Sequence, residues 1–176
     1  METKEIRRKL LYKDYSSAGD DEHIQYVISN RELIRSQFLS LYDDIYADIE
    51  TNDEILQRLA LRSVSYSSVN SQGAQIDGIY KLIEQKKNEK HRQIMELYDE
   101  VGRLEAYEEH VNLIWRCQRQ LPEELREVLD SLLIKKVSWK KFARSHQYSE
   151  STVSRLRKKA FSQIRSHYEE LYQRAL

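Results

Sequence analysis

The sequence predicts an all-α protein with N-terminal helices, a long heptad-patterned helix and a C-terminal helical domain. Only four of its 176 residues are glycine and one is proline, so the residues that break helices are scarce. Apolar residues recur at steps of three or four over most of the chain, which is the period of an amphipathic helix. Charged residues make up 33% of the chain, and no apolar stretch approaches the roughly 20 residues of a membrane span. We therefore expect a soluble protein that makes no membrane contact.

Residues 1–75 are expected to form an N-terminal helical region. A helix should begin after Asp20-Asp21-Glu22, because acidic residues suit the positive end of a helix dipole. Its apolar face runs from Ile24 to Ile49 with one wider gap near Asn30. This spacing predicts an amphipathic helix that is broken once.

A separate helix is predicted from Asn52 to Val64, where leucine and isoleucine recur at helical spacing. The next stretch, residues 65–75, is small and polar and contains Gly73. It is the clearest predicted loop in the chain.

Residues 76–120 are expected to form one long helix. With Ile76 as a heptad a position, most a and d positions are apolar, which predicts a helix packed along one seam. We expect a homodimer through the stretch where this seam is unbroken (Ile94, Leu97, Val101 and Leu104). The alternative is that residues 24–64 fold back and fill the same seam within one chain.

The positive charge of the chain is concentrated in its last third, residues 121–176. The whole protein is neutral, with 29 basic and 29 acidic side chains. Between Lys135 and Arg165, however, ten basic side chains face a single acid, Glu150, which leaves a net charge of +9. A local basic surface on a helix is what docking against DNA phosphates requires.

The residue spacing in this region predicts a helix-turn-helix unit. If Trp139 is its first position, Ala143 is fifth and Val153 is fifteenth, the two places where the helices of such a unit touch. Ser138 and Ser149 are suitable N-caps for the two helices. Gln147 stands in the turn where glycine is commonest.

These residues carry a family resemblance. The segment from Leu121 to Ile164, LPEELREVLDSLLIKKVSWKKFARSHQYSESTVSRLRKKAFSQI, resembles region 4 of the sigma-70 factors. With the preceding coil, the chain is similar to the ArpU and RinA-like late-gene activators of Gram-positive phages and prophages. The resemblance implies activation of phage or mobile-element genes, with contact to RNA polymerase. Lys136 departs from the family pattern, which has glycine there, so its turn must differ or be strained.

In such a unit the second helix enters the DNA major groove, which assigns roles to its exposed residues. We expect base readout by Ser151, Thr152 and Arg155, because arginine can grip guanine in a fork and hydroxyls can serve several bases. The expected phosphate contacts are the remaining basic residues of the unit: Lys140, Lys141, Arg144, Arg157, Lys158 and Lys159.

The sequence shows no pattern for catalysis, a cofactor or a metal. It has no Gly-rich phosphate loop, no GxSxG elbow and no Cys or His pairs at metal-binding spacing. Cys117 is the single cysteine, which suits a reducing cytoplasm, and the N-terminus lacks the apolar core of a secretion signal. We expect a cytoplasmic protein that is not an enzyme.

The pattern as a whole predicts a sequence-specific DNA-binding transcription regulator. One alternative is a phage small terminase subunit, which also joins a helix-turn-helix to an oligomerising coil. A second is a minimal sigma-like factor, although residues 20–60 are acidic where such a factor needs basic and aromatic residues. A third is an interaction protein whose motif no longer binds DNA.

Overall fold

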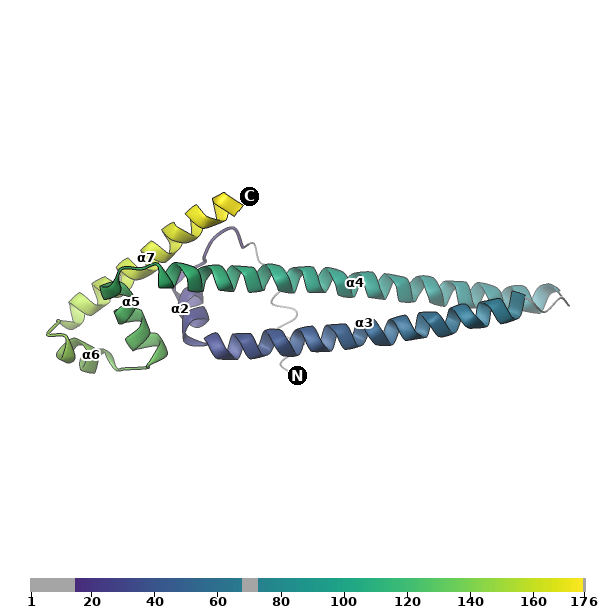
Figure 1. Ribbon diagram of the computed structural model, residues 1–176, viewed down its shortest axis with the longest axis horizontal. Helices are drawn as coiled ribbons and strands as arrows, with labels where there is room; N and C mark the ends of the chain where they lie inside the picture. Colours follow the sequence, from purple (N-terminus) through teal and green to yellow (C-terminus); the bar gives the residue numbers. More distant parts are fainter. Residues whose placement is uncertain (1–14, 68–72, 176) are drawn as a thin grey trace. The chain divides into compact units, whose positions relative to one another are not determined.

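In the computed structural model, α-helices account for almost all of the described chain, residues 15–67 and 73–175 (Figure 1). No strand occurs within these ranges, which confirms the all-α prediction. The elements are α2 (Asp21–Ser29), α3 (Arg31–Ser67), α4 (Gly73–Arg119), α5 (Glu123–Leu129), the π-helical turn η1 (Asp130–Ile134), α6 (Trp139–Ser145) and α7 (Glu150–Ala175). No helix in the described ranges is long and apolar enough to cross a membrane.

The chain divides into two compact units. The terminal unit comprises Met1–Phe38 and Glu105–Leu176, and the central unit comprises Leu39–Leu104. Helices α3 and α4 each contribute a segment to both units. The units do not coincide with the three consecutive regions expected from the sequence, because the two ends of the chain are combined in one of them.

In the terminal unit, the predicted break near Asn30 separates α2 from α3. Asp20 caps α2, since its carboxylate accepts from the His23 backbone N–H at 2.8 Å. At the other end, the Trp115 indole donates to the Val27 carbonyl at 3.1 Å. In an uninterrupted helix that carbonyl would accept from the backbone N–H four residues on. The Trp115 bond thus accompanies the break between the two helices.

The prediction of a separate helix from Asn52 to Val64 was wrong, because α3 runs unbroken from Arg31 to Ser67. Thr51 and Asn52, at the expected start of that helix, do not act as caps. The Thr51 hydroxyl donates to the Ala47 carbonyl at 2.9 Å, and the Asn52 amide donates to the Asp48 carbonyl at 2.8 Å. These bonds to the preceding turn keep both residues within one helix.

In the central unit, α3 and α4 lie side by side and antiparallel (Figure 1). Val101 and Leu104 are buried, and Ile94 and Leu97 are half-buried. Lys90, in a predicted polar layer of the heptad pattern, donates to Asn52 of α3 at 3.0 Å. Within the chain α3 lies along this seam, as in the alternative interpretation, but Ile94 and Leu97 stay only half-buried, so the homodimer stays a prediction.

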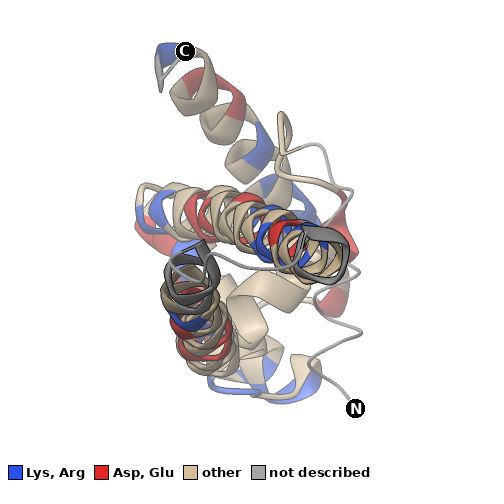
Figure 2. Ribbon diagram, turned by 90° about the vertical axis from the view of Figure 1, so that its right-hand side faces the viewer, with Lys and Arg blue, Asp and Glu red and all other residues tan. Residues whose placement is uncertain are grey.

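The outer surface of the central unit carries charges of both signs along α3 and α4 (Figure 2). Some of them pair within their own helix: Arg58 with Glu54 at 3.3 Å, and Arg92 with Glu96 at 3.6 Å. Exposed pairs of this kind add only a few tenths of a kcal/mol each, roughly 0.3–0.5. The central unit is therefore stabilised mainly by the apolar seam.

Of the predicted loop at 65–75, residues 65–67 belong to α3 and residues 73–75 to α4, while 68–72 lie outside the described residues. The long helix expected from residue 76 is confirmed as α4, which ends at Arg119 just before the Leu121-Pro122 pair. Cys117 is fully buried near its end, and burial raises the pKa of its thiol to about 11.

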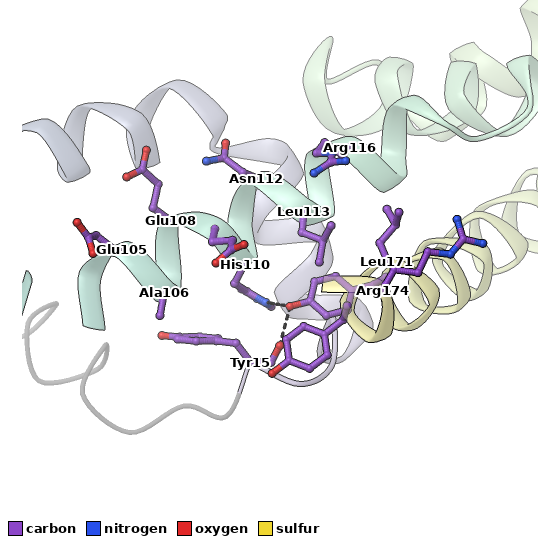
Figure 3. Close-up of a pocket in the computed structure, with 13 residues that line it drawn as sticks. Tyr15, Glu105, Ala106, Glu108, His110, Asn112, Leu113, Arg116, Leu171 and Arg174 are labelled. Carbon is purple, nitrogen blue, oxygen red and sulfur yellow. Dashed lines mark hydrogen bonds between the residues drawn. The ribbon is translucent and has the colours of Figure 1, made fainter. Parts of the chain in front are cut away.

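A relay of hydrogen bonds links the first described residues of the terminal unit to α4 and α7 (Figure 3). The Tyr168 hydroxyl donates to the Tyr15 carbonyl at 2.6 Å, so it must accept from His110 Nδ1 at 2.8 Å. In the neutral ring His110 Nε2 is then an acceptor, and it lies 2.8 Å from His23 Nε2, which must donate. The relay sets the tautomer of both histidines.

We predict that changing Leu97 and Val101 together to lysine unfolds the central unit. Val101 is buried in the central unit, and an unpaired buried charge costs several kcal/mol. Circular dichroism should show a loss of helical signal at 25 °C or a clearly lower midpoint. The matched control changes Met95 and Tyr98 to lysine; these are 62% and 51% exposed and should keep the wild-type midpoint. A helical 97/101 variant with half the wild-type mass would show instead that the seam joins two chains.

Candidate nucleic-acid interface

Helices α6 and α7 are joined by a short turn and pack on α5 and η1 around a small apolar core. Ala143 and Val153, the predicted contact positions, are both buried in this core. The other buried members are Phe142 from α6 and Val128 from α5. Partly buried side chains complete it: Leu132, Val137, Trp139, Tyr148 and Leu156. The two helices are thus held by the residues that the sequence spacing selects.

Both helices begin at the serines predicted as caps. The Ser138 hydroxyl accepts from the Lys141 backbone N–H at 3.4 Å at the start of α6. At the start of α7 the Ser149 hydroxyl accepts from the Thr152 backbone N–H at 3.1 Å. Each serine therefore satisfies an N–H group that its helix leaves without an internal partner.

The turn after α6 closes in a Schellman geometry. The Tyr148 N–H donates to the Ala143 carbonyl at 2.8 Å, and the Gln147 N–H donates to the Arg144 carbonyl at 3.4 Å. Gln147 lies between them with φ of +56°, in the left-handed region that favours glycine. The turn thus places a glutamine in the left-handed backbone conformation that glycine usually adopts.

Lys136, where the resemblance expects glycine, shows the same feature. Its φ is +51°, and it follows the π-helical turn η1. The next residue, Val137, donates its N–H to the Ser131 carbonyl at 2.9 Å. Lys136 and Gln147 are the non-glycine residues with positive φ in the described chain, so the expected strain at Lys136 is present.

The residues expected to read bases differ in accessibility. Ser151 and Arg155 are exposed on the same face of α7, four residues apart, whereas Thr152 is half-buried. The Ser149 hydroxyl lies 2.8 Å from both the Ser151 and Thr152 hydroxyls. Arg155 therefore presents the longest polar side chain of this trio to solvent.

Five of the six expected phosphate contacts are exposed side chains: Lys140, Lys141, Arg144, Lys158 and Lys159. Lys158 continues the face of Ser151 and Arg155 by almost one further turn of α7. The first three extend the basic surface onto α6.

Arg157, the sixth, is occupied within the protein. It is half-buried, donates to the Gln25 side chain of α2, and its guanidinium lies 4.8 Å from the centre of the Phe161 ring. Arg165 likewise pairs with Asp21 of α2. The structure thus places both arginines against α2. Sequence reasoning missed these contacts because their partners lie more than 130 residues away, and no local signal marks them.

His146 joins the turn to the supporting helix. Its Nδ1 lies 3.0 Å from the Phe142 carbonyl and its Nε2 lies 3.2 Å from the Glu127 carboxylate. Its ring stacks on Phe142 with centroids 4.1 Å apart. The hydrogen bond to the Phe142 carbonyl, and then the one to Glu127, raise the pKa of His146 above its ordinary value.

A groove of about 860 Å³ lies elsewhere in the terminal unit, between α4 and the last turns of α7 (Figure 3). Its α4 wall carries Glu105, Glu108 and Glu109, and its α7 wall carries Leu171 and Arg174. Its three carboxylates outnumber the two arginines of the lining, Arg116 and Arg174, so the groove is less suited to phosphates than the surface of α6 and α7. Within the described residues, no group of three or more His, Cys, Asp or Glu side chains is placed to hold a metal ion.

We predict that Lys136→Gly and Gln147→Gly each stabilise the terminal unit. Glycine removes the left-handed strain, and after its own entropic penalty the net gain should be about 0.5–1 kcal/mol. Urea unfolding measures it. The control is Lys135→Gly, at φ of −77°, which should destabilise by a similar amount. Destabilisation at all three positions would mean that the two turns are not strained.

We also predict that His146 contributes stability that is lost as pH rises. Its folded pKa lies above its ordinary value of 6.5, so the contribution is complete below that pH and disappears as pH passes the raised folded pKa. The free energy of unfolding should therefore fall more between about pH 6 and pH 8 in wild type than in His146→Gln. His91→Gln, at an exposed position on α4, serves as the control and should keep the wild-type pH dependence. An unchanged dependence in His146→Gln would refute the role.

No family model, curated protein or solved structure matches this chain, so its function is inferred from its own residues.

Proposed function

We propose that this chain is a cytoplasmic, sequence-specific DNA-binding transcription regulator that acts through α6 and α7 as a helix-turn-helix unit. The observation that carries the proposal is the exposed polar and basic face at the start of α7, formed by Ser151, Arg155 and Lys158. A short helix packed across a longer one, with the exposed start of the longer helix rich in donors, is the form that enters a major groove.

In this proposal Arg155 is the principal base-reading residue, with Ser151 and Thr152 beside it. Arginine recognises guanine O6 and N7 with two parallel hydrogen bonds, and each such pair discriminates by about 1–3 kcal/mol. The hydroxyls of Ser151 and Thr152 lie close to the Ser149 hydroxyl, so DNA would have to compete with those contacts. Their contribution to specificity should be smaller than that of Arg155.

The proposed phosphate contacts are the exposed basic residues Lys140, Lys141, Arg144, Lys158 and Lys159. They set the position of α7 on the duplex without reading sequence. Arg157 is left out of this set, because its guanidinium is held by Gln25 and packed on Phe161.

The resemblance to sigma-70 region 4 suggests that the regulated genes belong to a phage or mobile element and that RNA polymerase is a partner. A homodimer remains part of the proposal, since paired helix-turn-helix units bind half-sites about 34 Å apart. It would need a surface other than Val101 and Leu104, which are buried within the chain.

The small terminase subunit and the minimal sigma-like factor are the competing functions. A ring of eight or more chains in solution would favour terminase, whereas a dimer or monomer would favour a regulator. Transcription from a promoter with core RNA polymerase alone would favour the sigma-like role. Mass measurement and a reconstituted transcription assay separate the three.

We predict that duplex DNA binding weakens steeply with salt. If about six phosphates are neutralised, log K should fall with log salt at a slope near −5. Lys158→Ala should weaken all sequences alike and make the slope shallower by about 1. Arg155→Ala should instead lose about 1–3 kcal/mol mainly on the selected site. The control, Arg103→Ala on the exposed face of α4, should bind as wild type does. A wild-type slope near zero would exclude the proposed interface.

A further inference from the structure

Three arginines gather around one tryptophan in the terminal unit, apart from the basic surface of α6 and α7. The Arg31 guanidinium carbon lies 4.8 Å from the centroid of the Trp115 ring, and that of Arg35 lies 5.9 Å away. These two come from successive turns at the start of α3. Arg119 is one helical turn beyond Trp115 on α4, on the same side of that helix.

Like charges at this spacing repel one another. Burial lowers the pKa of Arg31 below its ordinary value, and the positive charges of Arg119 and then Arg35 lower it further. Glu32 opposes this effect, but it pairs with Arg35 at a distance of 3.9 Å with both side chains largely exposed. Three arginines and one glutamate leave the cluster with a net charge of +2.

The tryptophan compensates for only part of this repulsion. A guanidinium over an indole ring at a partly exposed site is stabilised by about 0.5–1 kcal/mol. The ring also offers no lone pair to the N–H groups of the arginines. Arg31 Nε is buried and has no hydrogen-bond acceptor. The N–H groups that can meet an anionic acceptor from solvent are those of Arg35 and Arg119, whose side chains are exposed.

The position of Arg31 adds to the positive potential. It is the first residue of α3, a helix of 37 residues, so the N-terminal end of the helix dipole lies beside its backbone. Helix α3 begins at the break where the Trp115 indole donates to the Val27 carbonyl. Ring, helix start and guanidinium groups therefore meet at one place.

We propose that Arg31, Arg35 and Arg119 form a binding site for a phosphate group. A phosphate carries one or two negative charges, which match the net +2 of the cluster, and its oxygens accept from several guanidinium N–H groups at once. The phosphate belongs either to the DNA backbone, in which case the site extends the proposed DNA contact beyond α6 and α7, or to a free phosphate-bearing ligand.

The first experiment uses inorganic phosphate as the probe, titrated into the full chain by calorimetry against chloride at equal ionic strength. The test variant changes Arg35 and Arg119 to glutamine and leaves Arg31 packed on Trp115. The matched control changes Arg92 and Arg103 to glutamine, two exposed arginines of α4 outside the terminal unit. Wild type and control should bind phosphate saturably, and the test variant at least about tenfold more weakly, since two charge-assisted contacts are removed.

The second experiment measures the salt dependence of duplex DNA binding for the same three proteins. If the phosphate is that of DNA, the test variant should show a slope shallower by about 2 than the control. If DNA binding is unchanged while inorganic phosphate binding is lost, the site serves a free phosphate ligand. The proposal is overturned if the test variant matches the control in both experiments, or if wild type responds to neither probe. A wild type that binds phosphate but no DNA would refute the proposed function and leave this site standing.

Discussion

The hydrogen bond from the Trp115 indole to the Val27 carbonyl is the contact on which the arrangement of the terminal unit depends. In a continuous helix the Val27 carbonyl would accept from a backbone N–H, but here it accepts from the Trp115 indole. The helix is interrupted nearby, at Asn30. Because α2 is not a straight extension of α3, it can pack on η1 and present Asp21 and Gln25 to α7. One buried side chain thus links the N-terminal helix to the helix proposed to enter DNA.

The contact between α2 and α7 divides the basic residues of the last third of the chain into two groups. In the sequence these lysines and arginines have almost no acidic neighbours, but in the fold some of them bind α2 and others stay exposed. Arg157 and Arg165 contact α2, while Arg155, Lys158 and Lys159 remain exposed. Only one of these two contacts is an ion pair: Asp21 of α2 pairs with Arg165, whereas the Gln25 side chain that accepts from Arg157 is neutral.

Much of this structure is predictable from local chemistry. Ser138 and Ser149 are caps, the gap near Asn30 is a break, and Ala143 and Val153 are buried, each as its residue type and spacing indicate. What could not be predicted depends on distant contacts. A heptad pattern is the same whether its partner is α3 or a second chain. No residue near Arg157 in the sequence indicates that its partner is Gln25. The spacing of leucine and isoleucine after Asn52 is the same in a separate helix and in the second half of a longer one, so it could not locate the start of α3.

The burial of Cys117 has a practical side. Its thiol stays protonated at neutral pH, because its pKa is raised to about 11, and it is shielded from solvent. Maleimide reagents and mild oxidants should not react with Cys117 while the protein is folded. A second cysteine, placed at any exposed position, would then be the single reactive handle on the surface. Fluorophores and crosslinkers can be attached to the protein at chosen positions without first removing the native thiol from the core.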